Sequence, residues 1–201
     1  MLNYTTIASE YPDTFNTKTE LAEAIIWIDV ETSGESPETD ELLEIGACIT
    51  DLSGRNIGNN FESLVTLSNL PEVLSKTSQN VINIHEKSGL WFDLWNKKTF
   101  DVHQIECSII EWLETHVDTE TVLYFGGNSI TLDRNFVRLN LPNFYRKISH
   151  RSIDVTSLSI ALQSNTLVGP YKKQKAHRAL LDAQDSVLEY RYYLSCVKNI
   201  V

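Results

Sequence analysis

The chain has 201 residues, of which 42% are hydrophobic and 22% charged, and its formal charge is −10 at pH 7. This composition is typical of a globular protein, and the length suits one domain with a substantial core. We expect neither membrane insertion nor classical secretion, because no apolar run approaches the roughly 20 residues of a bilayer span and no basic stretch precedes an apolar one at the start.

The first part of the chain predicts an extension followed by a buried strand. Residues 1–20 are rich in Thr, Tyr and Asn and read as an N-terminal extension, so we expect a single domain from 21 to 201. Residues 24–30 read AIIWIDV, an apolar and β-rich segment. Such a segment is typical of a central strand that is buried on both faces.

Two more strands are predicted next. The stretch 32–39 contains Gly and Pro and ends the first strand. Residues 42–51 and 57–67 have strand composition, and residues 52–56 (LSGRN) form the turn between them. The three strands therefore predict an antiparallel meander.

Helical periodicity dominates the rest of the chain. Residues 103–116 place Ile105, Ile109, Trp112 and Leu113 on one stripe, which predicts a helix. A short strand at 121–125 and further helices at 128–139, 154–162 and 179–196 follow. A meander followed by alternating strands and helices indicates an α/β fold with helices packed on the sheet.

The three cysteines indicate a reducing compartment. Cys48, Cys107 and Cys196 are odd in number and far apart, which disfavours a zinc site or a disulfide framework. Two of them lie in apolar segments, where a free thiol packs as a small hydrophobic group. We therefore expect a cytoplasmic protein.

The charge is distributed unevenly. Residues 1–133 have a net charge of −17, whereas residues 134–201 have a net charge of +7. A solvated basic face is the simplest explanation, but a basic third beside an acidic remainder also suits local binding of a phosphate chain. The acidic total disfavours a long, non-specific contact with duplex nucleic acid.

Two carboxylates stand at the end of the most hydrophobic strand. Asp29 and Glu31 are two residues apart, so the pleat of a strand directs both to the same side. Such a pair is costly unless it points into water or binds a cation, and both alternatives are open for an isolated Asp-x-Glu.

A third carboxylate lies in the segment GGNSITLDRNF. We expect Asn128 or Ser129 to open a helix there, with Asp133 one turn after Ser129 on the same face. A carboxylate, a hydroxyl and a helix N-terminus in one cleft suit phosphate and metal, whereas an exposed Asp–Arg pair is the alternative.

The last candidate pair is His177 and Asp182. A straight helix would put these side chains about 140° apart, so we expect His177 on the loop or first turn, reaching back over the site. A lone His is often structural, but beside a cation-bound water it is a natural general base at neutral pH.

Taken in order, these positions resemble the DEDDh family of 3′-to-5′ exonucleases, and within it they are most similar to oligoribonucleases. The resemblance rests on residues 27–45 (WIDVETSGESPETDELLEI), 127–136 (GNSITLDRNF) and 177–186 (HRALLDAQDS). Two shorter pieces also match, His85-x-x-Ser88-Gly89-Leu90 and Arg151-x-x-Asp154-Val155-Thr156. The resemblance runs from about residue 24 to the end of the chain.

This resemblance implies an RNase H-like fold with a mixed central sheet flanked by helices, two divalent cations (Mg²⁺ or Mn²⁺) and a homodimer. It implies that Asp29 bridges both cations and that Asp133 supports one of them. Glu31 and Asp182 would hold the cation beside the attacking water, and His177 would take the proton of that water. Two ions roughly 3.5–4 Å apart stabilise both the attacking and the leaving oxygen of a phosphodiester displacement.

The resemblance also implies a set of substrate-binding residues. The candidates that cap a 5′ phosphate or grip a base are Ser129, Arg151, Thr156, His85, Asn128 and His150, the last contributed across the dimer. Glu35 stands where an apolar residue is expected and Asn80 where an aromatic is expected, although His150 can still stack on a base. A strict preference for dinucleotides therefore does not follow from the sequence.

The leading prediction is an exonuclease that releases nucleoside 5′-monophosphates from very short single-stranded RNA. One alternative is a DEDDh exonuclease that acts on longer single-stranded RNA or DNA. Another is a non-catalytic module that binds nucleotide ends. The module is disfavoured because all five catalytic positions are filled, which binding alone does not need.

Overall fold

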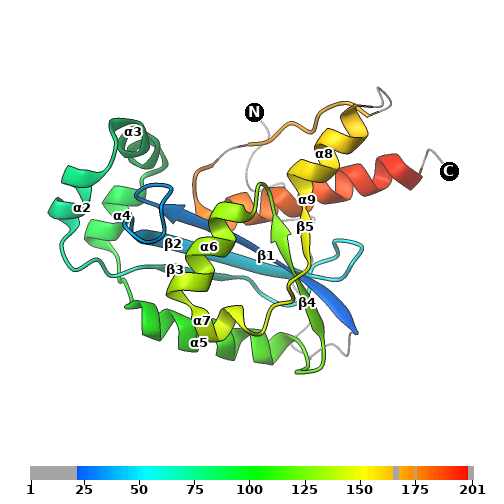
Figure 1. The fold of residues 1–201 in the computed structure, drawn as a ribbon, viewed down its shortest axis with the longest axis horizontal. Coiled ribbons are helices and arrows are strands. Elements are labelled where there is room, and N and C mark those ends of the chain that lie inside the picture. Colours follow the sequence, from blue (N-terminus) through cyan, green and yellow to red (C-terminus); the bar gives the residue numbers. More distant parts are fainter. Residues whose placement is uncertain (1–21, 165–167, 175, 199–201) are drawn as a thin grey trace.

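The computed structural model describes residues 22–164, 168–174 and 176–198, so the predicted extension at 1–20 lies outside the described residues. Five strands form one sheet in the spatial order β3-β2-β1-β4-β5 (Figure 1). These strands are β1 (Glu23–Thr32), β2 (Leu42–Thr50), β3 (Phe61–Leu64), β4 (Val122–Gly127) and β5 (Ser152–Asp154). Because β1 pairs antiparallel with β2 and parallel with β4, the sheet is mixed, as the sequence predicts.

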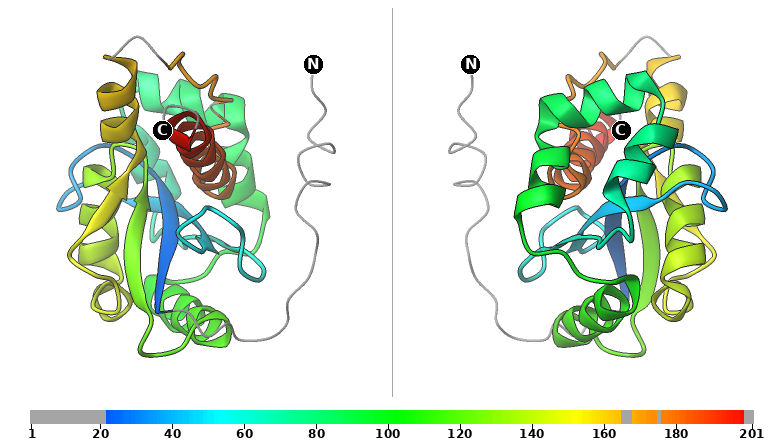
Figure 2. Two further views of the ribbon diagram at one scale, coloured as in Figure 1. Left: turned by 90° about the vertical axis from the view of Figure 1, so that its right-hand side faces the viewer. Right: turned by 90° about the vertical axis from the view of Figure 1, so that its left-hand side faces the viewer.

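Helices cover both faces of the sheet (Figure 2). They are α2 (Leu70–Lys76), α3 (Gln79–Ser88), α4 (Leu90–Asn96), α5 (Val102–His116), α6 (Thr131–Asn140), α7 (Pro142–Tyr145), α8 (Val155–Gln163) and α9 (Ala179–Lys198). On one face Ile26 belongs to a core cluster with Phe136 of α6 and Phe144 of α7. On the other, the rings of Trp27 and Tyr190 of α9 lie 5.2 Å apart. The predicted burial of β1 on both faces is confirmed.

Strands β1, β2 and β4 and helices α5, α8 and α9 lie close to their predicted positions, whereas other elements differ. The strand predicted at 57–67 is reduced to Phe61–Leu64, because Gly58 has a positive φ of 69° that interrupts the extended backbone. The sequence pattern predicts neither the helices α2 to α4 and α7 nor the three-residue strand β5. The capping residues Asn69 and Ser78 were the available signals, since both accept a hydrogen bond from the first turn of their helices.

The topology brings several segment ends to one edge of the sheet. The parallel strands β1, β4 and β5 all have their carboxyl ends there, and ligands of open α/β sheets bind at such an edge. The N-terminus of α9 packs directly against β2 at Gly46, where a Cβ would lie 2.1 Å from the backbone nitrogen of Leu180. This close approach requires glycine and places the start of α9 beside the end of β1.

Within the described part of the chain, no helix combines the length and apolar character needed to cross a membrane.

Candidate active site

Carboxylates from three elements converge at the end of β1. Asp29 lies opposite Gly46 in β2, and Glu31 follows two residues later with 8% of its surface exposed. The amide of Val30, between them, donates a 3.0 Å hydrogen bond to Oδ1 of Asp133 in the first turn of α6. This bond fixes the buried Asp133 carboxylate against the same strand end.

The loop before α9 brings His177 and Asp182 to the same place. One ligand atom from each of Glu31, His177 and Asp182 lies within 4.8 Å of the others. His177 has a left-handed backbone with φ of 52°, so the chain turns sharply before α9 begins at Ala179. Oδ1 of Asp182 accepts the amide of Ala176 at 3.1 Å, which ties this turn to the helix.

An arginine next to His177 anchors the turn. The Arg178 guanidinium donates to both carboxylate oxygens of Glu44, the shortest contact being 2.7 Å, and lies 2.8 Å from Oδ2 of Asp93 in α4. The amide of Ala179 donates to Glu44 as well, at 2.9 Å. Glu44 and Arg178 lie inside the sequence motifs, but sequence reasoning gave them no role, because their pairing spans strand β2 and the start of α9.

Burial and mutual repulsion raise the pKa of three carboxyls. For Asp29 burial is the largest cause, and the charges of Asp133, Glu31 and Asp182 add to it, so its pKa lies well above the usual value. The pKa of Glu31 rises from 4.5 to about 8, first through burial and then through Asp182 and Glu44. Burial also raises the pKa of Asp133, against the opposing hydrogen bond from β1. These groups therefore favour a proton or a cation in their midst.

His85 gives independent support for a cation at Glu31. The residue is 3% exposed, and its Nε2 lies 2.9 Å from the carbonyl oxygen of Thr32. That oxygen only accepts, so Nε2 donates. Among the described buried side chains, Nδ1 of His85 is the atom without a hydrogen-bond partner, and it lies 3.6 Å from Oε2 of Glu31. Two facing acceptors are favourable only when a proton or a cation lies nearby, so the residues fit a divalent ion.

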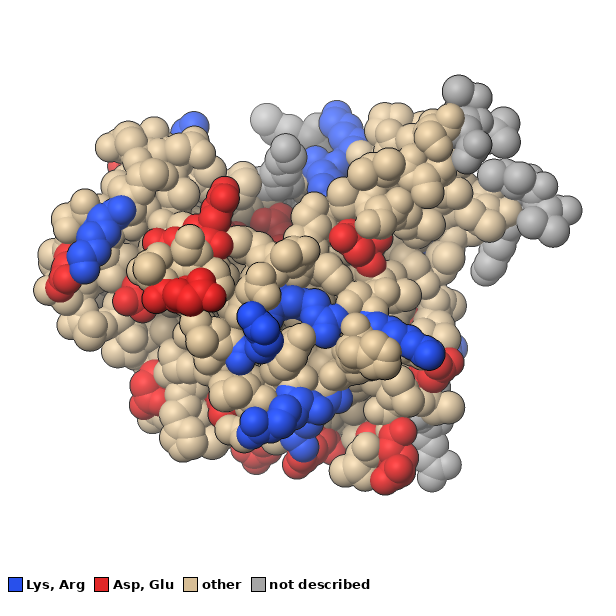
Figure 3. Space-filling model, viewed as in Figure 1, with Lys and Arg blue, Asp and Glu red and all other residues tan. Residues whose placement is uncertain are grey.

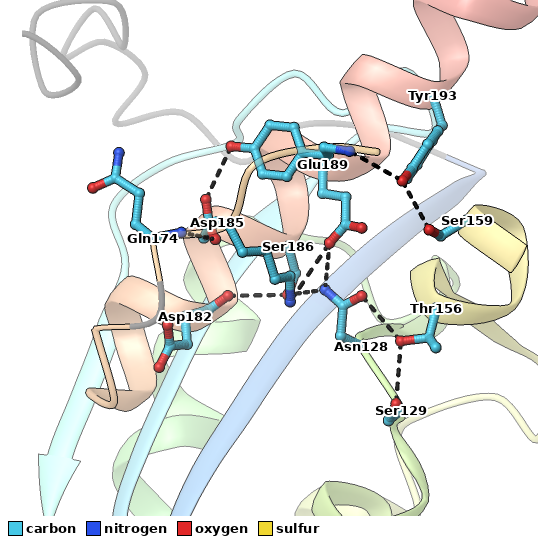
Figure 4. Close-up of polar contacts among 12 residues, drawn as sticks. Asn128, Ser129, Thr156, Ser159, Gln174, Asp182, Asp185, Ser186, Glu189 and Tyr193 are labelled. Carbon is cyan, nitrogen blue, oxygen red and sulfur yellow. Dashed lines mark hydrogen bonds and ion pairs between the residues drawn. The ribbon is translucent and has the colours of Figure 1, made fainter. Parts of the chain in front are cut away.

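A polar network extends from α9 toward β5 (Figure 4). Nδ2 of Asn128 donates to Ser186 at 2.9 Å and to Glu189 at 3.0 Å, and its Oδ1 accepts from Thr156 at 3.2 Å. The hydroxyls of Thr156 and Ser129 lie 3.1 Å apart. Asn128, Ser129 and Thr156 therefore form one hydrogen-bonded group, called the polar wall below, at the same edge of the sheet as the carboxylates.

The helix predicted at 128–139 is wrong at its start. It begins at Thr131, since Ser129 has a left-handed φ of 51° and its amide donates to Asp154 rather than entering a helical turn. Asn128 is likewise occupied by α8 and α9 instead of capping. Ser129 is exposed at this left-handed turn, beside Thr156.

The other substrate-binding candidates lie apart from this wall. Arg151 is exposed, precedes β5 and contacts the hydroxyl of Tyr124, so it lies at the opposite end of β5 from Thr156. His150 beside it is also exposed. The described contacts of His85 are on the Glu31 side and include neither Ser129 nor Thr156, so the structure does not bring His85 into their group.

The charge asymmetry of the sequence corresponds to a surface feature. Figure 3 shows basic side chains gathered over α6, α7 and the chain that leads to β5, with acidic side chains beside them on the same face. The exposed basic residues of these segments are Arg138, Arg146, Lys147 and Arg151. The basic residues that the sequence concentrates in its last third therefore lie partly together on one face of the molecule.

Comparison with known proteins decides the family. Residues 26–190 match the family model described as Exonuclease. The chain belongs to this exonuclease family. It is 30% identical to the oligoribonuclease of Rhodococcus jostii over 181 residues, covering 86% of this chain and 87% of the relative. It is 31% identical to the oligoribonuclease of Tropheryma whipplei over 172 residues, covering 84% and 90% of the two chains.

Solved structures agree on the fold. E. coli exonuclease I in a zinc-bound complex with single-stranded DNA superposes with a TM-score of 0.64 at 14% identity, over 87% of this chain and 41% of that one. The chain thus spans about two fifths of exonuclease I, and at this identity the likeness concerns the fold alone. The predicted DEDDh family and RNase H-like fold are confirmed. The protein is a 3′-to-5′ exonuclease of a divalent-metal-dependent family.

Proposed function

We propose that this exonuclease removes nucleoside 5′-monophosphates from the 3′ ends of very short RNA, dinucleotides included, with two Mg²⁺ or Mn²⁺ ions. The observation that carries the proposal is the convergence of four carboxylates and His177 at the end of β1. The oligoribonuclease relatives, which match over most of this chain, support the substrate class.

The carboxylates have distinct proposed roles. Asp29, which feels the charges of the other three, would hold both ions, and Glu31 with Asp182 would hold the ion on the His177 side. Asp133, fixed by the Val30 amide, would support the second ion. Bound ions would supply positive charge for the attacking and leaving oxygens of the displacement.

His177 is proposed as the general base. Its imidazole lies within reach of Glu31 and Asp182, so it can accept a proton from a water that attacks the phosphorus on that side. Arg178 and Ala176 fix the turn on which it sits and so orient the ring without contacting the substrate. As the water oxygen bonds to phosphorus, the bond from phosphorus to the 3′ oxygen of the preceding nucleotide breaks. That oxygen takes a proton from solvent, and His177 releases its proton to solvent.

The far end of the substrate is proposed to meet the polar wall. Ser129 and Thr156 offer hydroxyl groups for a terminal phosphate, and Asn128, whose amide group donates to Ser186 and Glu189, holds Thr156 in place. Arg151 and His150 precede β5, whereas Thr156 follows it, so the two residues lie away from the polar wall of their own chain. We therefore include a homodimer in the proposal, in which these two exposed residues reach the substrate of a second copy.

The chain is also proposed to form a single domain in the cytoplasm. We propose that residues 21–201 form one exonuclease domain. The described thiols of Cys48, Cys107 and Cys196 are free, which suits the reducing cytoplasm.

The test is the hydrolysis of 5′-labelled RNA and DNA of two to twenty nucleotides with Mg²⁺ or Mn²⁺, with a chelator as control. We expect metal-dependent shortening of RNA from its 3′ end, with dinucleotides cleaved fastest. Glu31→Gln should abolish the reaction, whereas the matched variant Glu111→Gln on the exposed face of α5 should behave as the native protein. No shortening by the native protein, or shortening that persists in chelator, would overturn the proposal.

A second candidate is an exonuclease for longer single strands. It is favoured by Glu35 and Asn80, which are exposed polar residues where the resemblance expects groups that grip bases. Equal cleavage of dinucleotides and long strands in the same experiment would select it.

A further inference from the structure

The segment that leads into α9 is held in one place by an acidic residue of that helix. Oδ1 of Asp185 accepts the hydroxyl of Tyr171 at 2.9 Å, and its Oδ2 accepts the amide of Gln174 at 3.1 Å. Figure 4 shows Asp185 and Gln174 in contact on the side of the helix that faces the segment. Lys173 lies between these two anchors, so its backbone position is fixed.

The Lys173 side chain reaches the carboxylate that holds the polar wall. Its Nζ lies 3.5 Å from Oε2 of Glu189, a buried carboxylate whose same oxygen accepts from Asn128 at 3.0 Å. The Lys173 side chain keeps 29% exposure, so it is not sealed in the core. The ammonium has three donors, and this long contact leaves it able to bind another oxygen.

The Lys173 ammonium also interacts electrostatically with the carboxylate cluster. Its positive charge lowers the pKa of both Asp29 and Asp133, against the burial that raises them. Arg178 also lies near the site, but its guanidinium is committed to Glu44 and Asp93. Lys173 is therefore a cation near both the carboxylates and the polar wall, and its ammonium remains able to bind a ligand.

We propose that Lys173 is a further substrate-binding residue, whose ammonium binds a non-bridging oxygen of the phosphate between the last two nucleotides, with Glu189 holding it ready. The position supports this role, because that phosphate must lie at the carboxylate cluster while the rest of the substrate reaches toward Ser129 and Thr156. The inference rests on the proposed function and adds a contact that the acidic cluster cannot supply.

The proposal predicts opposite effects on two ligands. Replacing Lys173 by Gln removes a charge that competes with cations, so Mn²⁺ should bind as tightly as before or tighter. The same change removes a charge-assisted hydrogen bond to phosphate, so a phosphate ligand should bind about ten- to a hundredfold more weakly. A purely structural role would instead weaken both ligands together.

The experiment uses calorimetry on the full chain with two probes. Mn²⁺ is titrated alone, and adenosine 5′-monophosphate, which retains the phosphate in question, is titrated at saturating Mn²⁺ with adenosine as the phosphate-free control. For Lys173→Gln we expect undiminished Mn²⁺ affinity, weaker monophosphate binding, unchanged adenosine binding and a lower kcat/KM on the dinucleotide. Lys173→Arg should retain most monophosphate affinity, and Lys172→Gln, at the exposed neighbouring residue, should match the native protein.

Two results would overturn the inference. One is unchanged monophosphate affinity in Lys173→Gln, and the other is an equal loss of adenosine or Mn²⁺ binding. If the native protein hydrolyses no RNA, the proposed function fails. If it hydrolyses RNA and Lys173→Gln binds the monophosphate as the native protein does, only the role of Lys173 fails.

Discussion

The metal-free protein should lose stability as the pH rises from 6.5 to 8, and a divalent cation should restore it. Burial beside Asp182 and Glu44 raises the pKa of Glu31 from 4.5 to about 8. In this pH range the folded state keeps a proton that the unfolded chain has already released, so rising pH favours unfolding. Each pH unit between the two pKa values lowers the free energy of unfolding by about 1.4 kcal/mol per group.

Glu31 alone should therefore remove about 2 kcal/mol between pH 6.5 and pH 8. Asp29 and Asp133, whose pKa values are also raised, act in the same direction. His85 acts in the opposite direction, because burial lowers its pKa, but most of its contribution lies below its unfolded value of 6.5. Above pH 6.5 the pH dependence of the free energy of unfolding therefore comes mainly from these carboxyl groups.

The assay is urea unfolding in chelator at pH 6.5, 7.2 and 8, repeated with millimolar Mn²⁺. Glu31→Gln should flatten the pH dependence and unfold at higher urea than the native chain at pH 8 without metal. Glu111→Gln, at an exposed helical position, should leave the dependence unchanged. A free energy of unfolding that stays constant or rises across this range in chelator would refute the reasoning.

Three further substitutions test other parts of the site. His177→Ala should lower kcat at neutral pH by a factor on the order of 10²–10⁴, the usual contribution of a general base. Its Mn²⁺ affinity in calorimetry should be retained. Lost Mn²⁺ affinity would make His177 a metal ligand instead. Gly46→Ala should lower the free energy of unfolding in urea by about 1–3 kcal/mol and reduce activity, because its Cβ would lie 2.1 Å from the backbone of α9. Gly169→Ala is the control, since its Cβ would lie 3.7 Å from the nearest atom. Equal effects of the two substitutions would contradict the close approach at Gly46. Arg151→Ala should slow cleavage of a 5′-phosphorylated dinucleotide roughly ten- to a hundredfold and leave a hexamer unaffected, and equal losses on both would exclude Arg151 from length selection.

The sequence predicted the elements whose hydrophobic pattern is long or extreme. Strand β1 and helices α5 and α9 were found because burial on two faces or along one stripe leaves a readable pattern over many residues. Helices of seven residues such as α2 and α4 span too few turns for that signal, so capping residues carry most of the information. Strand β5 has three residues and no pattern of its own.

Local signals misled where tertiary contacts competed for the same side chain. Asn128 reads as a good cap, but in the fold its amide group is used by Ser186, Glu189 and Thr156, so α6 starts three residues later. The carboxylate candidates were readable because each lies in a distinctive motif. The groups that position them were not, since the Arg178–Glu44 pair joins positions 134 residues apart.

The most direct test of the carboxylate cluster is diffraction from crystals grown with Mn²⁺, recorded at the manganese absorption edge. Anomalous peaks should lie within coordination distance of the carboxylate oxygens of Asp29, Glu31 and Asp182, and they should disappear in Asp29→Asn crystals. The assignment of the active site would be contradicted if manganese bound elsewhere and not at these carboxylates, while the same preparation hydrolysed RNA.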